Sequence, residues 1–196
     1  MERIRVFVAV DLSEYVLEKV RAHVDHLKTD ISAGIDWVNA TSMHMTLVFI
    51  GNVETQRIPA ICQAINGATD SIYPFRVWFN EIGAFANINK PRVICLGMQH
   101  VPSELISLHA KIIEELRSAN FLIETRPRFT PHITVGRIIK RAHRDIYGAN
   151  IGQVLENYEL SDGIPAGIDK VRLFRSDIGK AGVVYSPIYT RLLSDM

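Results

Sequence analysis

The residues best suited to chemistry in this sequence are two histidine–threonine pairs. His44 and Thr46 lie within the apolar run 43–51, and His132 and Thr134 lie in a second run with the composition of a strand. In a strand, side chains two residues apart point to the same face, so each histidine emerges beside its threonine. Two such strands brought together would place two imidazoles and two hydroxyls around one small volume.

Two imidazoles and two hydroxyls in one site suit the cleavage of a phosphodiester. The ordinary pKa of histidine, ~6.5, allows one ring to accept a proton from water while the other donates a proton to the leaving oxygen. Threonine hydroxyls can donate hydrogen bonds to the nonbridging phosphoryl oxygens and stabilise the charge that develops in the transition state. Such a set works without a metal ion, and a strained cyclic phosphate suits it best because the leaving group stays tethered.

The spacing of the two pairs indicates an internal repeat. Both the histidines and the threonines are 88 residues apart, since 132 − 44 and 134 − 46 give the same offset. The offset also lays residues 6–10 of an expected strand over 3–10 on the apolar residues 94–98. It lays the apolar stripe of an expected helix over 14–28 on that of a second helix, which begins at Pro102. We therefore expect two lobes related by approximate twofold symmetry, with equivalent residues facing each other across a cleft.

The other segments alternate between strand and helix patterns. Ser13 is the expected N-cap of the first helix. The remaining expectations are an extended piece at 36–38, a helix over 56–66, strands over 74–83, 91–98, 170–175 and 183–193, and a polar mixture of loop and helix over 140–158. No linker interrupts them, so we expect a single two-lobed domain over residues 1–196.

The composition favours a compact protein without a strong overall charge. The 196 residues are 47% hydrophobic, which supplies a core for one domain or two closely packed lobes. The net charge is +1, so any contact with nucleic acid must be local. Cys62 and Cys95 lack C-x-x-C spacing and are expected to be buried, reduced thiols. Arg3 and Arg5 interrupt any signal peptide, and no apolar stretch approaches the ~20 residues of a membrane span, so we expect a cytoplasmic protein.

Positive charge gathers around the second pair. The basic residues between 117 and 144, where Glu124 is the only acid, are Arg117, Arg126, Arg128, Arg137, Lys140, Arg141 and Arg144. A basic rim there could hold an RNA backbone, and a solvated cationic loop is an equally good interpretation for most of them.

Arg137 is the strongest candidate among these residues, because it ends the second motif strand and can form a bidentate phosphate contact. Strict alternation, however, puts Arg137 on the face opposite His132. It then reaches the site only if Gly136 permits a bulge or the strand ends there. The same alternation puts Phe49 on the face opposite His44.

Other catalytic and binding motifs are missing from the sequence. The seven histidines include no H-x-H or H-E-x-x-H metal pattern, and we interpret His23 and His26 as ordinary surface residues. The sequence contains no G-x-x-x-x-G-K-[ST] or G-x-G-x-x-G phosphate loop, and no serine lies in a nucleophile elbow. We therefore expect neither a metal ion nor a cofactor.

Several stretches around the two pairs resemble one known family. They are residues 5–12, 37–38, 44–53 and 129–137, the last of which includes an arginine five residues after its histidine. On these motifs the sequence resembles the two-histidine phosphoesterase superfamily, and within it the RNA 2′,3′-cyclic phosphodiesterases, also called 2′-5′ RNA ligases. The resemblance implies an α+β fold of two pseudo-symmetric lobes. Each lobe would be an antiparallel sheet with helices packed on its outer face, and the active-site cleft would lie between them.

The resemblance also implies an activity and the residues that carry it. The activity is hydrolysis of a terminal 2′,3′-cyclic phosphate of RNA to a 2′-phosphate without metal or ATP, with 2′-5′ ligation as the reverse reaction. His44 would be the proton donor and His132 the proton acceptor. Thr46 and Thr134 would hold the phosphoryl oxygens, with Arg137 as a further phosphate contact. The substrate would be an RNA end, such as that of a tRNA fragment, and the enzyme a monomer.

Several points stay open from the sequence alone. A related two-histidine enzyme could instead remove 3′-terminal nucleotides from RNA or open small cyclic nucleotides, and a non-catalytic module could bind RNA ends. The sequence does not decide which histidine is the acid and which the base. Phe85, Phe129 and Tyr185 could stack on a nucleobase, although a place in the core is the better interpretation of each.

Overall fold

The structure is a computed structural model that describes residues 2–31, 34–124, 128–139, 146–160, 163–179 and 182–194. Its strands are β1 (Arg3–Asp11), β2 (Ile35–Trp37), β3 (His44–Glu54), β4 (Phe75–Phe79), β5 (Glu81–Asn87), β6 (Lys90–Gly97), β7 (Ile133–Ile138), β8 (Ile164–Ile168), β9 (Lys170–Gly179) and β10 (Gly182–Leu192). Its α-helices are α1 (Glu14–Asp30), α2 (Ile58–Thr69), α3 (Ser103–Ser118) and α4 (Ile146–Glu156).

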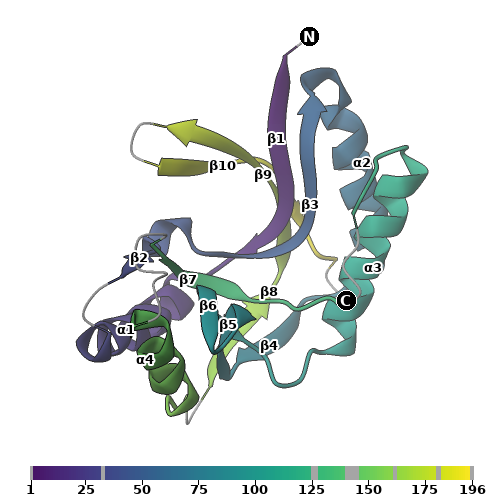
Figure 1. The fold of residues 1–196 in the computed structure, drawn as a ribbon. Helices are drawn as coiled ribbons and strands as arrows, with labels where there is room; N and C mark the ends of the chain where they lie inside the picture. Colours follow the sequence, from purple (N-terminus) through teal and green to yellow (C-terminus); the bar gives the residue numbers. More distant parts are fainter. Residues whose placement is uncertain are drawn as a thin grey trace.

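Most of the strands form one antiparallel sheet in the order β10–β9–β1–β3–β7–β6–β5, with β2 paired to β7 (Figure 1). A single residue pair, Met45 with Ile133, joins β3 to β7. The sheet therefore divides into a β10–β9–β1–β3 half and a β7–β6–β5 half that meet at this pair. The α+β class with two antiparallel halves is confirmed, and the halves share an edge rather than standing apart.

The helices of the first sequence repeat recur 88 residues later along the chain. Adding 88 to the bounds of α1 gives 102–118, against 103–118 for α3, and adding it to those of α2 gives 146–157, against 146–156 for α4. Met45 and Ile133 differ by the same offset, so the sheet's two halves meet at residues that are equivalent in the repeat. A local twofold axis between them places one histidine–threonine pair on each side. We propose on this basis that the chain arose by duplication and forms a single two-lobed domain.

Helices cover the outer side of each half, and each half receives one helix from each repeat. The first pair is α2 and α3, which pack together and run beside β3, and α4 packs on β6 in the other half (Figure 1). The apolar stripes expected for the long helices are buried, as Val20 and Leu27 on α1 and Leu108 on α3 show. The predicted N-cap is also present, because the Ser13 hydroxyl accepts a hydrogen bond of 3.4 Å from the Val16 amide.

Two strand predictions differ from the structure. Residues 74–83 form two strands rather than one, because the chain changes partner at Asn80 from β8 to β6. The Asn80 amide donates to the carbonyl of Gly97 and its side chain accepts from the amide of Gln99, which holds the corner. The sequence prediction also lacks β8, which pairs with β4 in a separate two-stranded sheet. The residue types do contain a signal for the change of partner, because Asn80 and Glu81 are two successive polar residues that shift the apolar parity between Phe79 and Ile82.

The two cysteine thiols are free, as expected, although Cys62 is only half-buried. Burial raises the pKa of Cys95 to about 12, so this thiol stays protonated at neutral pH. Within the described residues, the structure contains no helix with the length and apolar character that crossing a membrane requires.

Gly136 lies where β2 crosses close to β7, opposite Trp37. A Cβ atom there would meet Ile35 Cγ2 at 2.7 Å and Trp37 Cε3 at 3.2 Å, and neither neighbour can move without disturbing β2. We expect Gly136→Ala to lower the free energy of unfolding by about 1–3 kcal/mol. Thermal and urea unfolding measure the effect, and Gly167→Ala is the matched control because a Cβ there meets nothing within 4 Å. An equal loss in both variants would contradict the steric explanation.

Candidate active site

The two motif strands meet at one cleft of about 590 Å³. It is lined by all five residues selected from the sequence: His44, Thr46, His132, Thr134 and Arg137. The other lining side chains come mainly from β1, β9 and β10, so the cleft opens between the β1–β9–β10 wall and β7. Residues 88 apart in sequence are therefore neighbours in space.

Each histidine ring is oriented by a backbone carbonyl two residues before it. His44 Nδ1 lies 2.8 Å from the carbonyl oxygen of Ser42, and His132 Nδ1 lies 2.9 Å from that of Thr130. A carbonyl oxygen only accepts, so Nδ1 carries the hydrogen in both rings. Nε2 is then the atom of each neutral ring that can take up a proton, as acid–base catalysis requires. Ser42 and Thr130 are again 88 residues apart, and the two rings are held in the same way.

The environment of His44 favours its neutral form. Burial lowers the pKa of His44, and the positive charges of Arg137 and His132 lower it further, while the hydrogen bond to Ser42 opposes them. Three aromatic rings enclose this imidazole: Phe7 at 4.9 Å, Phe174 at 6.0 Å and the edge of Tyr185 at 4.8 Å between centroids. They supply the apolar surroundings that penalise its charge.

The position of Arg137 is explained by a β-bulge in β7. The register with β6 passes from Cys95 opposite Thr134 to Ile94 opposite Gly136, so Val135 is the extra residue. A bulge shifts the alternation by one position, which returns Arg137 to the face of Thr134 and into the cleft. Strict alternation, which puts Arg137 on the opposite face, is therefore wrong here.

The first motif strand has a bulge at the equivalent position. Opposite β1, the register passes from Thr46 to Val48, so Leu47 is the extra residue, 88 before the bulged position of β7. Val48 is consequently buried, and Phe49 turns to the cleft with 57% of its surface exposed. The alternation prediction for Phe49 is thus also wrong. Phe49 and Arg137 are equivalent in the repeat, so the cleft has an aromatic ring on one side and a guanidinium on the other.

The positive charge of the cleft comes mostly from an unexpected place. Of the basic residues around the second motif that the structure describes, Arg137 lines the cleft, Arg128 lines a neighbouring cavity, and Arg117 donates to the carbonyl of Ile123. The predicted Arg126, Lys140, Arg141 and Arg144 lie outside the described residues. Instead, Arg3 and Arg5 of β1 and Arg175 of β9 line the cleft. The alternation of Arg3 and Arg5 with buried Ile4 and Val6 was the available signal.

The residues proposed for base stacking differ in position. Tyr185 lines the cleft, and Phe85 lies 4.7 Å from the His132 ring between centroids. Phe129 is stacked on His109 at 3.8 Å and lines the neighbouring cavity rather than the cleft. Tyr185 and Phe85 therefore each lie beside one of the two histidines, His44 and His132 respectively, whereas Phe129 packs away from the cleft.

The histidines expected at the surface lie in another groove of about 640 Å³, beside α1 and the end of α4. His26 lies 3.9 Å from the Asp30 carboxylate, and His23 Nδ1 lies 2.9 Å from the hydroxyl of Tyr158. Neither motif reaches this groove, so we place the site in the smaller cleft. In the part of the chain that the structure describes, no three His, Cys, Asp or Glu side chains are grouped so that they could hold a metal ion.

Comparison with known proteins agrees with this geometry. A two-lobed α+β fold with one His-x-Thr strand from each half is the form expected of a two-histidine phosphoesterase. Residues 16–179 match the model of the 2′-5′ RNA ligase superfamily, and the chain belongs to this superfamily. The resemblance found in the sequence is thereby confirmed.

Named relatives and a solved structure are similar over nearly the whole chain. The RNA 2′,3′-cyclic phosphodiesterase of Thermotoga maritima is 26% identical over 94% of this chain and 93% of the relative. That of Methanothermobacter thermautotrophicus is 29% identical over 94% of this chain and 96% of the relative. The crystal structure of E. coli LigT in apo form matches with a TM-score of 0.76, 21% identity and full coverage of both chains, which supports the fold.

Proposed function

We propose that this protein hydrolyses the terminal 2′,3′-cyclic phosphate of RNA to a 2′-phosphate. The observation that carries the proposal is the pair of histidines, each tied through Nδ1 to a backbone carbonyl, on either side of the Met45–Ile133 contact in one cleft. The names of its relatives from Thermotoga maritima and Methanothermobacter thermautotrophicus support the same substrate class. Product analysis tests it: a cyclic-phosphate RNA should yield only a 2′-phosphate end.

The proposed mechanism uses the two histidines as base and acid. His132 Nε2 takes a proton from water as the water oxygen forms a bond to phosphorus. The bond from phosphorus to O3′ breaks, and His44 donates a proton to the departing O3′. Thr46 and Thr134 donate hydrogen bonds to the nonbridging oxygens, and the guanidinium of Arg137 binds them as charge develops. In 2′-5′ ligation an RNA 5′-hydroxyl takes the place of water, so His132 again accepts the proton of the nucleophile and His44 again donates to O3′. The two roles exchange only in the reverse of ligation, when O3′ attacks and the 2′-5′ bond is cleaved back to the cyclic phosphate.

The proposed mechanism needs no metal ion or cofactor, so activity should persist in EDTA. We also propose that the enzyme is monomeric and cytoplasmic and that RNA ends such as those of tRNA fragments are its substrates. Stepwise loss of 3′ nucleotides would instead indicate the related exonuclease function. Binding of cyclic-phosphate RNA without turnover would indicate a non-catalytic module.

The role of His44 as donor has a consequence for pH dependence. A donor must be protonated, and the pKa of His44 is lowered, so its proton is lost as pH rises through a value below that of an ordinary histidine. A bound phosphate carries negative charge and raises this pKa again. We therefore expect the alkaline limb of kcat/KM, which reports the free enzyme, to lie at lower pH than the alkaline limb of kcat.

Steady-state rates between pH 4.5 and 9, on the order of one point every half unit, measure the alkaline limbs of kcat and kcat/KM. The apparent pKa values that these profiles give belong to the two histidines as an interacting pair. Histidine NMR of the free protein, with His44 assigned through a His44→Gln variant, then identifies the group. A free-enzyme pKa of His44 at or above the ordinary value of ~6.5 would contradict the expected displacement of the alkaline limb of kcat/KM.

A further inference from the structure

Two arginines of β1 carry positive charge on the cleft wall that no carboxylate balances. Arg3 and Arg5 are exposed and line the cleft together with Arg175 of β9. Asp177 is the only acid among the described residues that line the cleft, and it is bonded to Arg175 at 2.9 Å. Among the described residues, neither Arg3 nor Arg5 forms an ion pair, although Arg3 donates to the carbonyl of Asn52 at 3.1 Å.

These arginines lie beyond the aromatic part of the cleft as one moves away from the histidines. Along the β1–β3 register, Asp11 is opposite His44, Phe7 opposite Phe49, and Arg5 opposite Asn52. The His44 ring itself leans along the strand and lies 4.9 Å from the Phe7 ring between centroids, so Arg5 is two residues, about 7 Å along β1, beyond the ring that packs on this histidine. The wall therefore presents the acid–base site first, then aromatic rings, then free positive charge.

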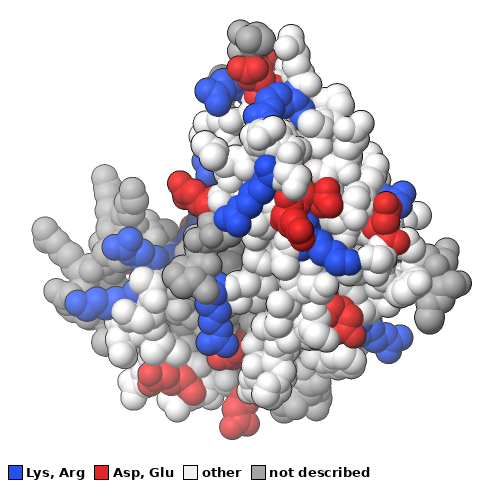
Figure 2. Space-filling model, turned by 90° about the vertical axis from the view of Figure 1, so that its right-hand side faces the viewer, with Lys and Arg blue, Asp and Glu red and all other residues white. Residues whose placement is uncertain are grey.

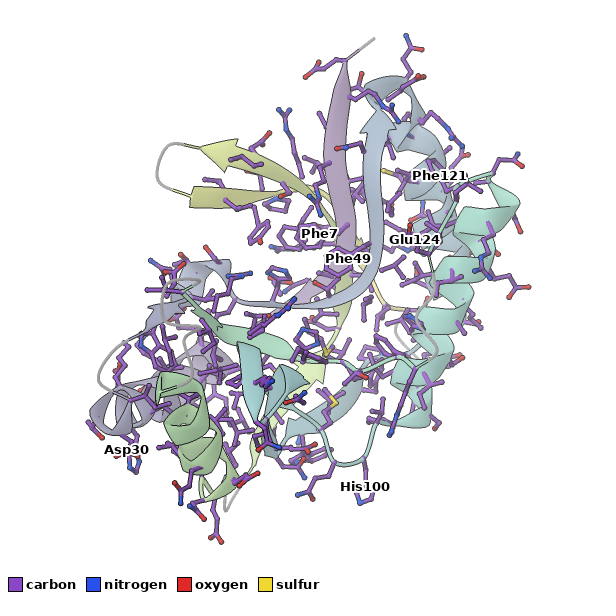
Figure 3. The ribbon with its side chains drawn as sticks, viewed as in Figure 1. Phe7, Asp30, Phe49, His100, Phe121 and Glu124 are labelled. Atoms are coloured by element: carbon purple, nitrogen blue, oxygen red, sulfur yellow. The ribbon has the colours of Figure 1, made fainter. Side chains whose placement is uncertain are left out.

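The aromatic step is accessible to a ligand. Figure 3 shows Phe7 and Phe49 close together beside β1 and β3, and their centroids are 6.1 Å apart. Phe7 is buried against the His44 ring, whereas Phe49 has more than half of its surface exposed in the cleft. A flat apolar ring followed by unpaired cations is the combination with which proteins bind single-stranded nucleic acid, through base stacking and backbone contacts.

The cleft wall differs in charge from the α2–α3 side of the molecule. On the α2–α3 side of the molecule, Figure 2 shows positive and negative side chains interspersed, which gives no field of one sign. The overall charge of +1 likewise provides no general attraction for RNA. Within the part of the chain that the structure describes, Arg3 and Arg5 are a place where cations gather without acids and can therefore favour a polyanion.

We propose that Arg3, Arg5 and Arg175, here called the arginine wall, bind the phosphodiester backbone of single-stranded RNA on the 5′ side of the reacting nucleotide. The proposal rests on the proposed function, since a nucleotide whose 3′ side ends in a cyclic phosphate can extend only from its 5′ side. With the reacting phosphate between the histidines, the preceding nucleotides pass Phe49 and reach the arginine wall. The enzyme is then selective for oligoribonucleotides over mononucleotides that carry the same cyclic end.

The test compares three substrates: adenosine 2′,3′-cyclic phosphate, its 5′-phosphorylated form, and an RNA pentamer with the same terminal nucleotide. Wild type should have the highest kcat/KM on the pentamer. In Arg3→Ala/Arg5→Ala, we expect the ratio of kcat/KM for pentamer to that for mononucleotide to fall about tenfold or more, since charged hydrogen bonds to phosphate are lost. The slope of log Kd against log salt for the pentamer should decrease by about 1.4 in the double variant, because each of the two lost phosphate contacts contributes roughly 0.7 to the slope.

Two variants serve as controls. Arg76→Ala removes an exposed strand arginine of β4 that does not line the cleft, and its ratio should equal that of wild type. Arg3→Lys/Arg5→Lys keeps the positive charge, so it should keep most of the salt slope that Arg3→Ala/Arg5→Ala loses. If truncation acted only by disturbing the structure, restoring the charge would not restore this slope.

The binding of a pentamer that already ends in a 2′-phosphate, measured by fluorescence anisotropy, separates this proposal from the proposed function. One outcome is that wild type opens no cyclic phosphate while the double variant Arg3→Ala/Arg5→Ala binds this pentamer more weakly than wild type does. In that outcome the proposed function fails and the arginine wall stands. Equal ratios and equal pentamer affinities in wild type and the double variant would overturn the arginine wall. So would a 5′-phosphorylated mononucleotide that is as good a substrate as the pentamer, because a single phosphate would then account for the charge.

Discussion

Replacing either cleft histidine with alanine is expected to lower kcat for opening a 2′,3′-cyclic phosphate by about 10²–10⁴-fold. His44 and His132 are each oriented by a carbonyl so that Nε2 is the atom that exchanges a proton, and no other histidine lines the cleft in the described part of the chain. Loss of one ring therefore removes either the acid or the base. The assay measures 2′-phosphate product from adenosine 2′,3′-cyclic phosphate in the presence of EDTA.

The control for these variants is His26→Ala, which removes an exposed imidazole in the other groove and should leave the rate within about twofold, as expected for a surface substitution. The double variant His44→Ala/His132→Ala should be little slower than the slower single variant, because the two rings act as one unit. Full activity of either single variant, with unfolding unchanged, would show that the reaction does not use the pair.

The convergence of the two motifs was predictable because it depends on a repeat rather than on a fold recognised in detail. A common offset of 88 residues makes the two motif strands equivalent under a twofold arrangement, and equivalent strands beside the axis are neighbours, as the pairing of Met45 with Ile133 shows. The long amphipathic helices were equally accessible, since their apolar stripes have no competing interpretation. The half of the sheet that each helix covers could not be predicted from the sequence. The helices α1 and α3 each cover the half formed mainly by the other repeat, and this depends on the path of the chain between the lobes.

The remaining features of the cleft could not be read from residue types. Leu47 and Val135 are ordinary strand residues, and only the pairing register identifies them as the extra residues of two bulges. Each bulge changes the face of the residues that follow it, so Phe49 and Arg137 reach the cleft against their sequence parity. In β3 the change ends at a second register shift, where Ile50 is the extra residue. Arg3 was informative only as an interruption of an apolar segment until the sheet placed it on the cleft wall.

The two halves differ where the chemistry demands a difference. A symmetric pair of imidazoles in identical surroundings would titrate alike, whereas acid–base catalysis needs one to be protonated and the other neutral. The repeat supplies identical ring orientations through Ser42 and Thr130, and then places Phe49 and Arg137 at equivalent positions. The guanidinium in place of an aromatic ring is thus one source of the asymmetry. It disfavours the charged form of His44 in the free enzyme, and the negative charge of a bound phosphate acts in the opposite direction.

Arg137→Ala is expected to lower kcat/KM by about 10–100-fold, because a charged hydrogen-bond donor to the phosphoryl oxygens is lost. It should also change the pH profile. The charge of Arg137 is one of the causes that lower the pKa of His44, so its removal raises that pKa and moves the alkaline limb of kcat/KM to higher pH. A residue with only a structural role would not move this limb.

Arg137→Lys separates the two effects of the guanidinium. An ammonium keeps the positive charge near His44 but cannot form the planar bidentate contact with phosphate. We therefore expect the lysine variant to remain slow while its alkaline limb stays close to that of wild type, as measured by kcat/KM across pH. If both variants kept wild-type kcat/KM, Arg137 would line the cleft without binding phosphate, and Thr46 and Thr134 would be the donors left to stabilise the transition state.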